Sequence, residues 1–145
     1  MYAAETVAEY FLSLVDPEAG DAITNLKLQK LLYYAQGLHL ALFGRPLFSD
    51  RMEAWMHGPV VPTVYHRYKT FGVNPLPVSE DFDPAQLDAE TQAFLNEVYE
   101  VYGQFSAWKL RNMTHTESPW LDAPEGQEIS HDRLQEFFQT RIEPA

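Results

Sequence analysis

The strongest constraint on the fold is a long helical pattern over residues 24–43. The side chains expected on its buried face recur at spacings of three and four residues; they are Leu28, Leu31, Leu32, Ala35, Leu38, His39 and Leu42. Thr24 or Asn25 can cap the start, and Gly44 followed by Pro46 can end the helix. A helix of this length spans roughly 30 Å, about the diameter of a small domain. We therefore expect it to be the central helix of the fold.

The rest of the chain predicts one all-α (α-dominated) domain over residues 1–145, with its core at about 4–142. Spacing, caps and stop residues predict about six helices in total: the central helix, helices near 4–15, 62–71, 88–103 and 107–115, and a last one after Ser130. A short helical turn is expected at Ser118-Pro119. Short apolar runs near 47–57 predict a small extended pair, followed by a turn at His57-Gly58-Pro59. Residues 73–86 form an acidic, proline-rich loop.

The composition limits where and how the protein works. The chain has no cysteine, which excludes disulfides, thiolate metal sites and a cysteine nucleophile, and which is compatible with a reducing compartment. Residues 1–10 contain two glutamates and no basic residue, so they do not read as a signal peptide. The most apolar stretch, residues 38–43, is too short to span a membrane. We expect a cytoplasmic protein that does not associate with membranes.

Charge is distributed unevenly along a chain whose net charge is −11. Residues 77–104 contain seven acidic residues and no basic one, whereas residues 22–76 contain six basic residues and two acidic ones. An acidic protein is poorly suited to nucleic acid, because binding there depends on neutralising phosphates. The acidic segment therefore indicates either a basic protein partner or simply a solvated surface.

Motifs that carry catalytic chemistry are missing from the sequence. No two of the seven glycines form a Gly-x-Gly pattern, and neither a Gly-x-Ser-x-Gly nor a His-Glu-x-x-His motif occurs. The five histidines have no spacing that recommends a metal site. We expect a protein that is not an enzyme, with no catalytic residues, no cofactor and no metal. The catalytic alternative is a small metal- or histidine-dependent hydrolase that uses His57 and His115.

Two short segments concentrate tryptophan, histidine and proline in tight turns. The residues concerned are Trp55, Gly58, Pro59, Thr114, His115, Pro119 and Trp120. Buried indole and imidazole groups need hydrogen-bond partners, so one interpretation is a buried network that joins two parts of the fold. The other interpretation is an aromatic docking site for a partner.

Three ordered motifs resemble the Panacea antitoxin domain, a family that includes SocA-like antitoxins and phage-associated GepA-like proteins. The first is the segment 23–37, and the second is 53–65, with its Ala-Trp and Gly-Pro-Val-Val-Pro sequences. The third consists of Leu110, then Thr114-His115, then Pro119-Trp120. The resemblance covers about residues 4–142. It starts so early that we expect none of the extra N-terminal DNA-binding domain that some members carry.

The resemblance implies a compact helical domain that neutralises a toxin by direct protein–protein contact. It also implies an alternative, because a SocA-like member acts as an adaptor that delivers its toxin to a bacterial AAA+ protease. The expected partner is therefore a cognate protein toxin, with an AAA+ protease as a further candidate partner. The sequence leaves the identity of the toxin and the oligomeric state open.

The expected docking surface lies at the start of the long helix and at the Gly-Pro turn. Its residues are Lys27, Lys30, Tyr33, Tyr34, His57 and Val60. Lys27 and Lys30 are three residues apart and share one helix face, which predicts a basic surface patch. Alternatively, Lys30 only neutralises a nearby carboxylate.

Overall fold

The central element of the fold is α2 (Asn25–Phe43), in a computed structural model that describes residues 1–142. The Thr24 hydroxyl accepts a hydrogen bond from the Lys27 N–H (3.3 Å), and Gly44, with φ of 72°, ends the helix. Both predicted ends are thus confirmed. Fourteen of the nineteen residues of α2 are buried, so the helix is covered on nearly every side and not on one face alone.

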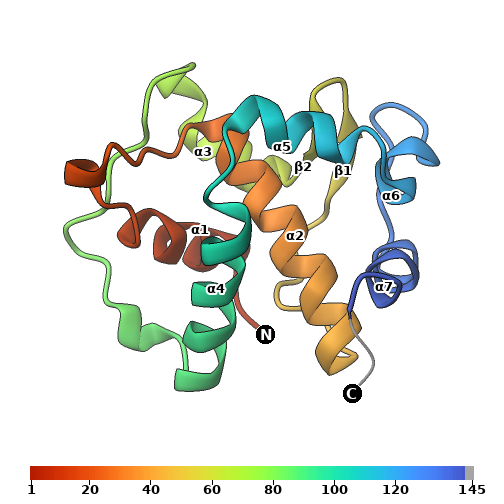
Figure 1. Ribbon diagram of the computed structural model, residues 1–145, viewed down its shortest axis with the longest axis horizontal. Helices are drawn as coiled ribbons and strands as arrows, with labels where there is room; N and C mark the ends of the chain where they lie inside the picture. The colour runs from red at the N-terminus through yellow and green to blue at the C-terminus, as the bar shows by residue number, and fades with distance from the viewer. Residues whose placement is uncertain (143–145) are drawn as a thin grey trace.

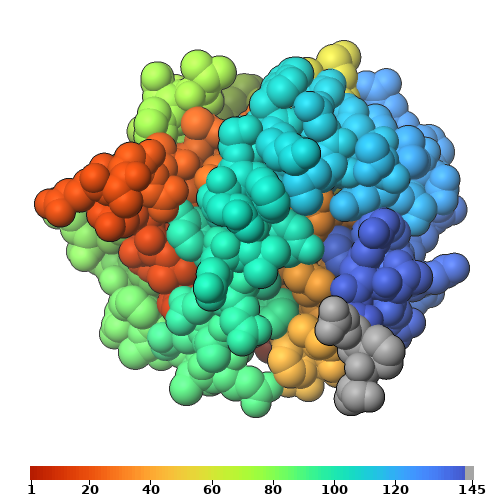
Figure 2. Space-filling view, in the orientation of Figure 1, coloured from red at the N-terminus to blue at the C-terminus, as the bar shows by residue number. Residues whose placement is uncertain are grey.

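The other helices pack around α2, which confirms the α-dominated fold class. They are α1 (Ala4–Ser13), α3 (Pro62–Tyr68), α4 (Ala89–Tyr102), α5 (Ala107–Thr114), α6 (Ser118–Leu121) and α7 (His131–Gln139), with short 3₁₀ turns at Pro17–Ala19, Lys69–Phe71 and Pro84–Gln86. In Figure 1, α2 runs diagonally through the centre, with α1 and α4 on one side and α7 on the other. In Figure 2 it is visible mainly in gaps between its neighbours and at its C-terminal end. No helix within residues 1–142 combines the length and apolar character needed to cross a bilayer.

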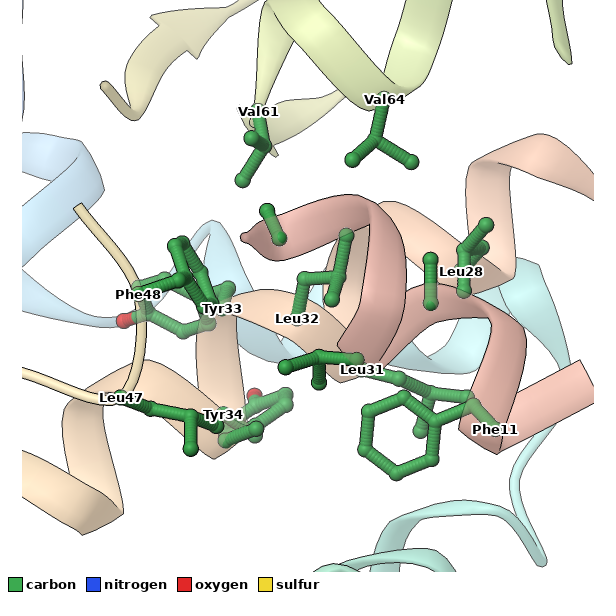
Figure 3. Packing of buried hydrophobic residues seen from close by; sticks show 14 of the residues in the cluster. Phe11, Leu28, Leu31, Leu32, Tyr33, Tyr34, Leu47, Phe48, Val61 and Val64 are labelled. Carbon is green, nitrogen blue, oxygen red and sulfur yellow. The ribbon is translucent and has the colours of Figure 1, made fainter. Parts of the chain in front are cut away.

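The apolar core forms where these segments meet α2. Figure 3 shows Leu28, Leu31 and Leu32 of α2 among side chains from α1, α3 and the segment 47–48. Each fully buried leucine or phenylalanine contributes about 1.5–3 kcal/mol relative to an exposed one. Burial of this kind explains why α2 tolerates several polar residues in its interior positions.

Those buried polar residues of α2 are hydrogen-bonded to the backbone of distant segments. Asn25 Nδ2 donates to Tyr65 O (3.1 Å), Lys27 Nζ to Gly103 O (2.7 Å), Lys30 Nζ to Pro59 O (3.0 Å) and Gln36 Nε2 to Phe48 O (2.7 Å). Each bond satisfies a carbonyl that burial would otherwise leave unpaired at a cost of about 1–3 kcal/mol. The helix therefore holds four surrounding segments in place, at α3, the end of α4, β2 and the loop after α2.

The β element is a hairpin of β1 (Glu53–Trp55) and β2 (Gly58–Val60), which is antiparallel and turns at Met56 and His57. The predicted small β element is confirmed, but its strands lie within 53–60 and not 47–57, and Gly58 and Pro59 belong to the second strand and not to the turn. Pro59 is paired with Ala54. The Ala54 N–H donates outward to Gln127 O (3.0 Å), and the Ala54 C=O accepts from Gly126 N (2.6 Å). Since this pair exchanges no hydrogen bonds, a proline without an N–H fits there.

Leu47 and Phe48 have a different role from the one predicted. Both are buried, and their N–H groups donate to Gln36 Oε1 at 2.8 and 3.2 Å. Phe48 also forms an isolated bridge with Tyr2 near the start of the chain. The apolar pair is therefore an anchored core segment and not a strand of the hairpin.

Candidate functional site

An apolar groove opens between the N-terminal part of α2, the hairpin, the end of α3 and the start of α5. Its volume is about 480 Å³. The lining residues are Asn25, Leu26, Gln29, Lys30, Trp55, Met56, His57, Val60, Tyr65, Lys69, Gly72, Val73 and Trp108. The groove thus combines residues from the first two sequence motifs with Trp108, which the sequence placed only on a predicted helix.

Large apolar side chains are exposed around this groove. Val73, Met56 and Trp108 have exposed fractions of 90%, 65% and 55%, and all three line the groove. Trp55 lies beside them, with its ring 4.9 Å from that of Tyr65 in an edge-to-face arrangement. Scattered exposed apolar residues are ordinary, but a group around one concave surface is typical of an interaction site.

The floor of the groove is held in place by α2. Gln29 Oε1 accepts from the Val61 N–H (2.9 Å), while Lys30 Nζ donates to Pro59 O (3.0 Å), so strand β2 is held at its middle residue and just after its last residue. Gly58 lies directly over Lys30 with φ of 112°. A Cβ at this position would be 2.5 Å from Lys30 Cε and 2.8 Å from Thr114 Oγ1. Only glycine allows this close approach, and the hairpin is therefore preformed.

Lys27 and Lys30 are buried, so the prediction of a basic surface patch is wrong. Their spacing does put them on one face of α2, but the hairpin and the end of α4 cover that face. Burial, together with the smaller effect of the Arg111 charge, lowers the pKa of Lys30 to about 7. Within residues 1–142 no acidic side chain pairs with Lys30, so it does not neutralise a local carboxylate either.

Tyr33 and Tyr34 are also interior residues. Their hydroxyl groups donate to the carboxylate of Glu117, at 2.9 Å from Tyr33 and 3.0 Å from Tyr34. The Tyr34 ring stacks on that of Tyr102 with centroids 4.0 Å apart. Burial raises the pKa of Glu117, while the two tyrosine hydrogen bonds lower it. Sequence reasoning missed this contact, because nothing local connects Glu117 to a helix that lies eighty residues earlier.

Of the predicted docking residues, His57 alone is exposed. Its Nδ1 accepts a 3.4 Å hydrogen bond from Arg111 Nε, and its ring lies 5.9 Å from that of Trp108. Val60 is buried but lines the groove together with Lys30. The structure therefore gathers His57, Val60 and Lys30 at one place and leaves Lys27, Tyr33 and Tyr34 outside it.

The tryptophan and histidine motifs meet behind the hairpin. Trp120 Nε1 donates to Trp55 O (2.7 Å), and the Trp120 ring stacks on His115 with centroids 3.9 Å apart. Thr114 is buried beside Gly58, and Pro59 and Pro119 are buried as well. These contacts join α5 and α6 to the hairpin, which is what the network interpretation requires. They also support the wall of the neighbouring groove.

The histidines named for the hydrolase alternative have other contacts. His57 faces a guanidinium and an indole, while His115 is stacked, with a buried Nε2 that has no hydrogen-bond partner among residues 1–142. Burial lowers the pKa of His115, and the charges of Arg111, Lys30 and His57 lower it further. No group of three His, Asp or Glu side chains able to hold a metal ion occurs in the described part of the chain.

Comparisons with known proteins identify the family. Residues 28–121 match the family described as "Antitoxin SocA-like, Panacea domain", which includes most of α2 and all of β1, β2 and α3 to α6. The protein named Antitoxin SocA from Caulobacter vibrioides (strain NA1000 / CB15N) is 52% identical over 50 residues, which are 34% of this chain and 27% of that protein. The aligned region thus spans about a quarter of that relative's length. No solved structure matches the chain.

The family match covers the central part of the fold. It covers more than half of the chain, and it contains the second and third motifs, most of the first motif and of α2, and the whole hairpin. On these grounds the chain belongs to the SocA-like antitoxin family with a Panacea domain.

Proposed function

We propose that this protein is an antitoxin that neutralises a cognate protein toxin by direct binding, and that the toxin docks in the groove beside the hairpin. The observation that carries this proposal is the exposure of Met56, Val73 and Trp108 around one concave surface. The family match and the similarity to the protein named Antitoxin SocA support the antitoxin role.

The groove has the properties of a binding hot spot. Tryptophan and arginine are enriched at positions that dominate binding energy, and Trp108 lies here with the Arg111 guanidinium 4.5 Å from its ring centroid. The floor is fixed by Gln29 and Lys30, so binding does not have to order the hairpin. Preorganisation of this kind favours tight association.

The docking surface would extend past the hairpin. A typical stable interface covers about 800 Å² per partner, which is more than one groove supplies. A second hollow of about 340 Å³ lies on the other side of Trp55 and Met56, and it is lined by Trp120 and by Leu121, which is 54% exposed. The exposed apolar side chains of both hollows would thus contact the same partner, with the hairpin between them.

The proposal predicts that exposed groove residues are needed for binding but not for folding. Trp108→Ser and Met56→Ser should each weaken the toxin complex at least about tenfold and reduce protection in a growth assay, because each removes a contact area that is desolvated on binding. Their melting temperatures should remain close to that of the unmodified protein. The toxin for this test is the product of the gene next to that of the antitoxin, and affinity is measured by titration calorimetry.

Leu42→Ser provides the matched control, because Leu42 is 52% exposed and lies near the C-terminal end of α2, outside the groove. It should leave affinity unchanged. The groove is not the docking site if Trp108→Ser and Met56→Ser bind as tightly as the control. Direct neutralisation itself is wrong if protection requires less than one antitoxin per toxin, or if toxin levels fall only while an AAA+ protease is active.

A further inference from the structure

The groove differs in charge from the rest of the molecule. The whole chain has a net charge of −11, yet none of the described residues that line the groove is acidic. The lining contains Lys30, His57 and Lys69, and Arg111 adjoins it through contacts with His57 and Trp108. An apolar hollow with basic groups is therefore set in an acidic protein.

Among the residues 1–142 that the structure describes, no carboxylate pairs with Arg111, and other groups hold it in position. Its Nε donates to His57 Nδ1 (3.4 Å), its Nη1 donates to Asn112 Oδ1 (3.1 Å), and its guanidinium lies over the Trp108 ring. By contrast, Arg51, Arg67 and Arg133 each lie within ion-pair distance of an acidic side chain. A guanidinium oriented by stacking loses little side-chain entropy when it binds a carboxylate.

Two further cations strengthen the positive potential at this place. Lys69 is exposed on the groove wall, and no acidic side chain in residues 1–142 pairs with it. Lys30 lies beneath the hairpin, close enough to Arg111 for the two charges to repel one another. A negative group bound beside Arg111 would relieve that repulsion.

We propose that the toxin segment that occupies the groove carries an aspartate or glutamate between apolar side chains, and that Arg111 and Lys69 bind its carboxylate. Apolar side chains of the segment would contact Trp108, Met56 and Val73. This inference rests on the proposed function, since it names the chemistry of the partner at the same groove.

Charge reversal provides the test. The double variant Arg111→Glu with Lys69→Glu should bind the toxin about 10- to 100-fold more weakly, because it faces the incoming carboxylate with like charge. The double variant Arg111→Gln with Lys69→Gln should lose less affinity than the double charge reversal. Because it introduces no glutamate, a loss of affinity in this variant cannot come from a new glutamate paired with Lys30. Arg45→Glu is the control, since Arg45 is an exposed arginine just beyond the other end of α2. Thermal melts of all variants confirm that each is folded.

Overlapping synthetic peptides of the toxin identify the segment. The full-length antitoxin should retain peptides that contain Asp or Glu beside apolar residues, and replacing that acid by asparagine or glutamine should abolish retention. Reversing the same acid to lysine in the intact toxin should restore affinity for the Arg111→Glu, Lys69→Glu variant.

The outcomes separate this inference from the proposed function. If the charge reversals bind as well as or better than the unmodified protein while Trp108→Ser still weakens binding, the groove is the docking site but its ligand is not acidic. If Trp108→Ser also binds normally, the docking site itself is wrong. A groove closed by a second copy of this chain, seen as a dimer that Trp108→Ser converts to monomers, would also overturn the acidic segment.

Discussion

For Lys30, the environment predicted from the sequence differs from the one in the structure. Its position three residues after Lys27 predicts a shared face, and that much is correct. Residue spacing does not predict whether this face of α2 is covered, because the hairpin that covers it lies more than twenty residues further along the chain. In the structure the lysine lies beneath Gly58 and bonds the carbonyl of Pro59. Burying this charged group costs free energy, and in return the lysine holds the strand beside the groove in place.

Burial of Lys30 makes the stability of the protein depend on pH. Its pKa is about 7 in the folded state, against roughly 10.4 when unfolded. Between these values the unfolded chain holds the extra proton, so the free energy of unfolding should rise with pH by up to about 1.4 kcal/mol per unit. Below about pH 7 both states are protonated and the contribution is constant. Lys30→Met should remove this rise, which urea unfolding at pH 7.5 and 9 measures.

Lys109→Met is the comparison for this experiment, since Lys109 is an exposed lysine on α5. It should show the slope of the unmodified protein. The loss of the bond to Pro59 adds a cost of about 1–3 kcal/mol to Lys30→Met that does not depend on pH, so it does not affect how the stability of this variant changes with pH. Equal slopes for the two variants would mean that Lys30 retains its ordinary proton affinity.

Among the elements, helix ends were predictable because they depend on local chemistry. Ser106 and Ser130 cap α5 and α7 as expected, and their hydroxyls accept from Lys109 N (3.0 Å) and Arg133 N (3.2 Å). The hairpin register was not predictable. It depends on the segment after α6, where Gly126, Gln127 and Ile129 bond the outer edge of the hairpin. That edge partner lies some seventy residues further along the chain.

The contact between α2 and α7 is limited by a single glycine. A Cβ on Gly37 would lie 2.1 Å from Phe138 Cδ2, which is far inside van der Waals contact. Gly37→Ala should therefore destabilise the protein by about 1–3 kcal/mol, although alanine ordinarily favours a helix by about 1 kcal/mol. Urea unfolding measures the change. In a Phe138→Leu background the penalty should shrink, and a penalty of the same size there would mean that the ring is not its cause.

At the scale of the whole molecule, the acids of α4 and the groove belong to different elements. Helix α4 contains Glu90, Glu97 and Glu100, and none of its residues lines the groove. A one-sided field of this kind acts mainly on the rate of association. Glu97→Lys with Glu100→Lys should slow association with a toxin that is basic overall and flatten its salt dependence, as stopped-flow mixing would show. A toxin that is basic overall can still present one carboxylate to the groove.

The control must change the net charge equally. Glu18→Lys with Glu136→Lys reverses two exposed acids on other parts of the surface. If both pairs change the rate alike, net charge accounts for the effect and the acidic side has no special role. If neither changes it, the acidic segment is a solvated surface only.

The family and the fold class could be recognised from sequence because motifs and helix periodicity are carried by neighbouring residues. The binding surface could not, since the motif residues that stand out most are those that build the interior. Lys27, Tyr33 and Tyr34 bond the chain to itself, at Gly103 and Glu117. The groove combines His57 with Trp108, Val73 and Lys69 from three separate elements. Only the folded chain brings these exposed residues together.

The coverage of α2 on all sides also determines how the molecule can open. Its side chains bond α3, the end of α4, β2 and the segment after α2, so no one neighbour can leave without breaking bonds to the helix. Such a helix becomes accessible only when the whole domain unfolds, and its amide protons would exchange with solvent at that slow rate. A protease would find few partly opened forms to attack. The cellular lifetime of this protein would then follow its global stability.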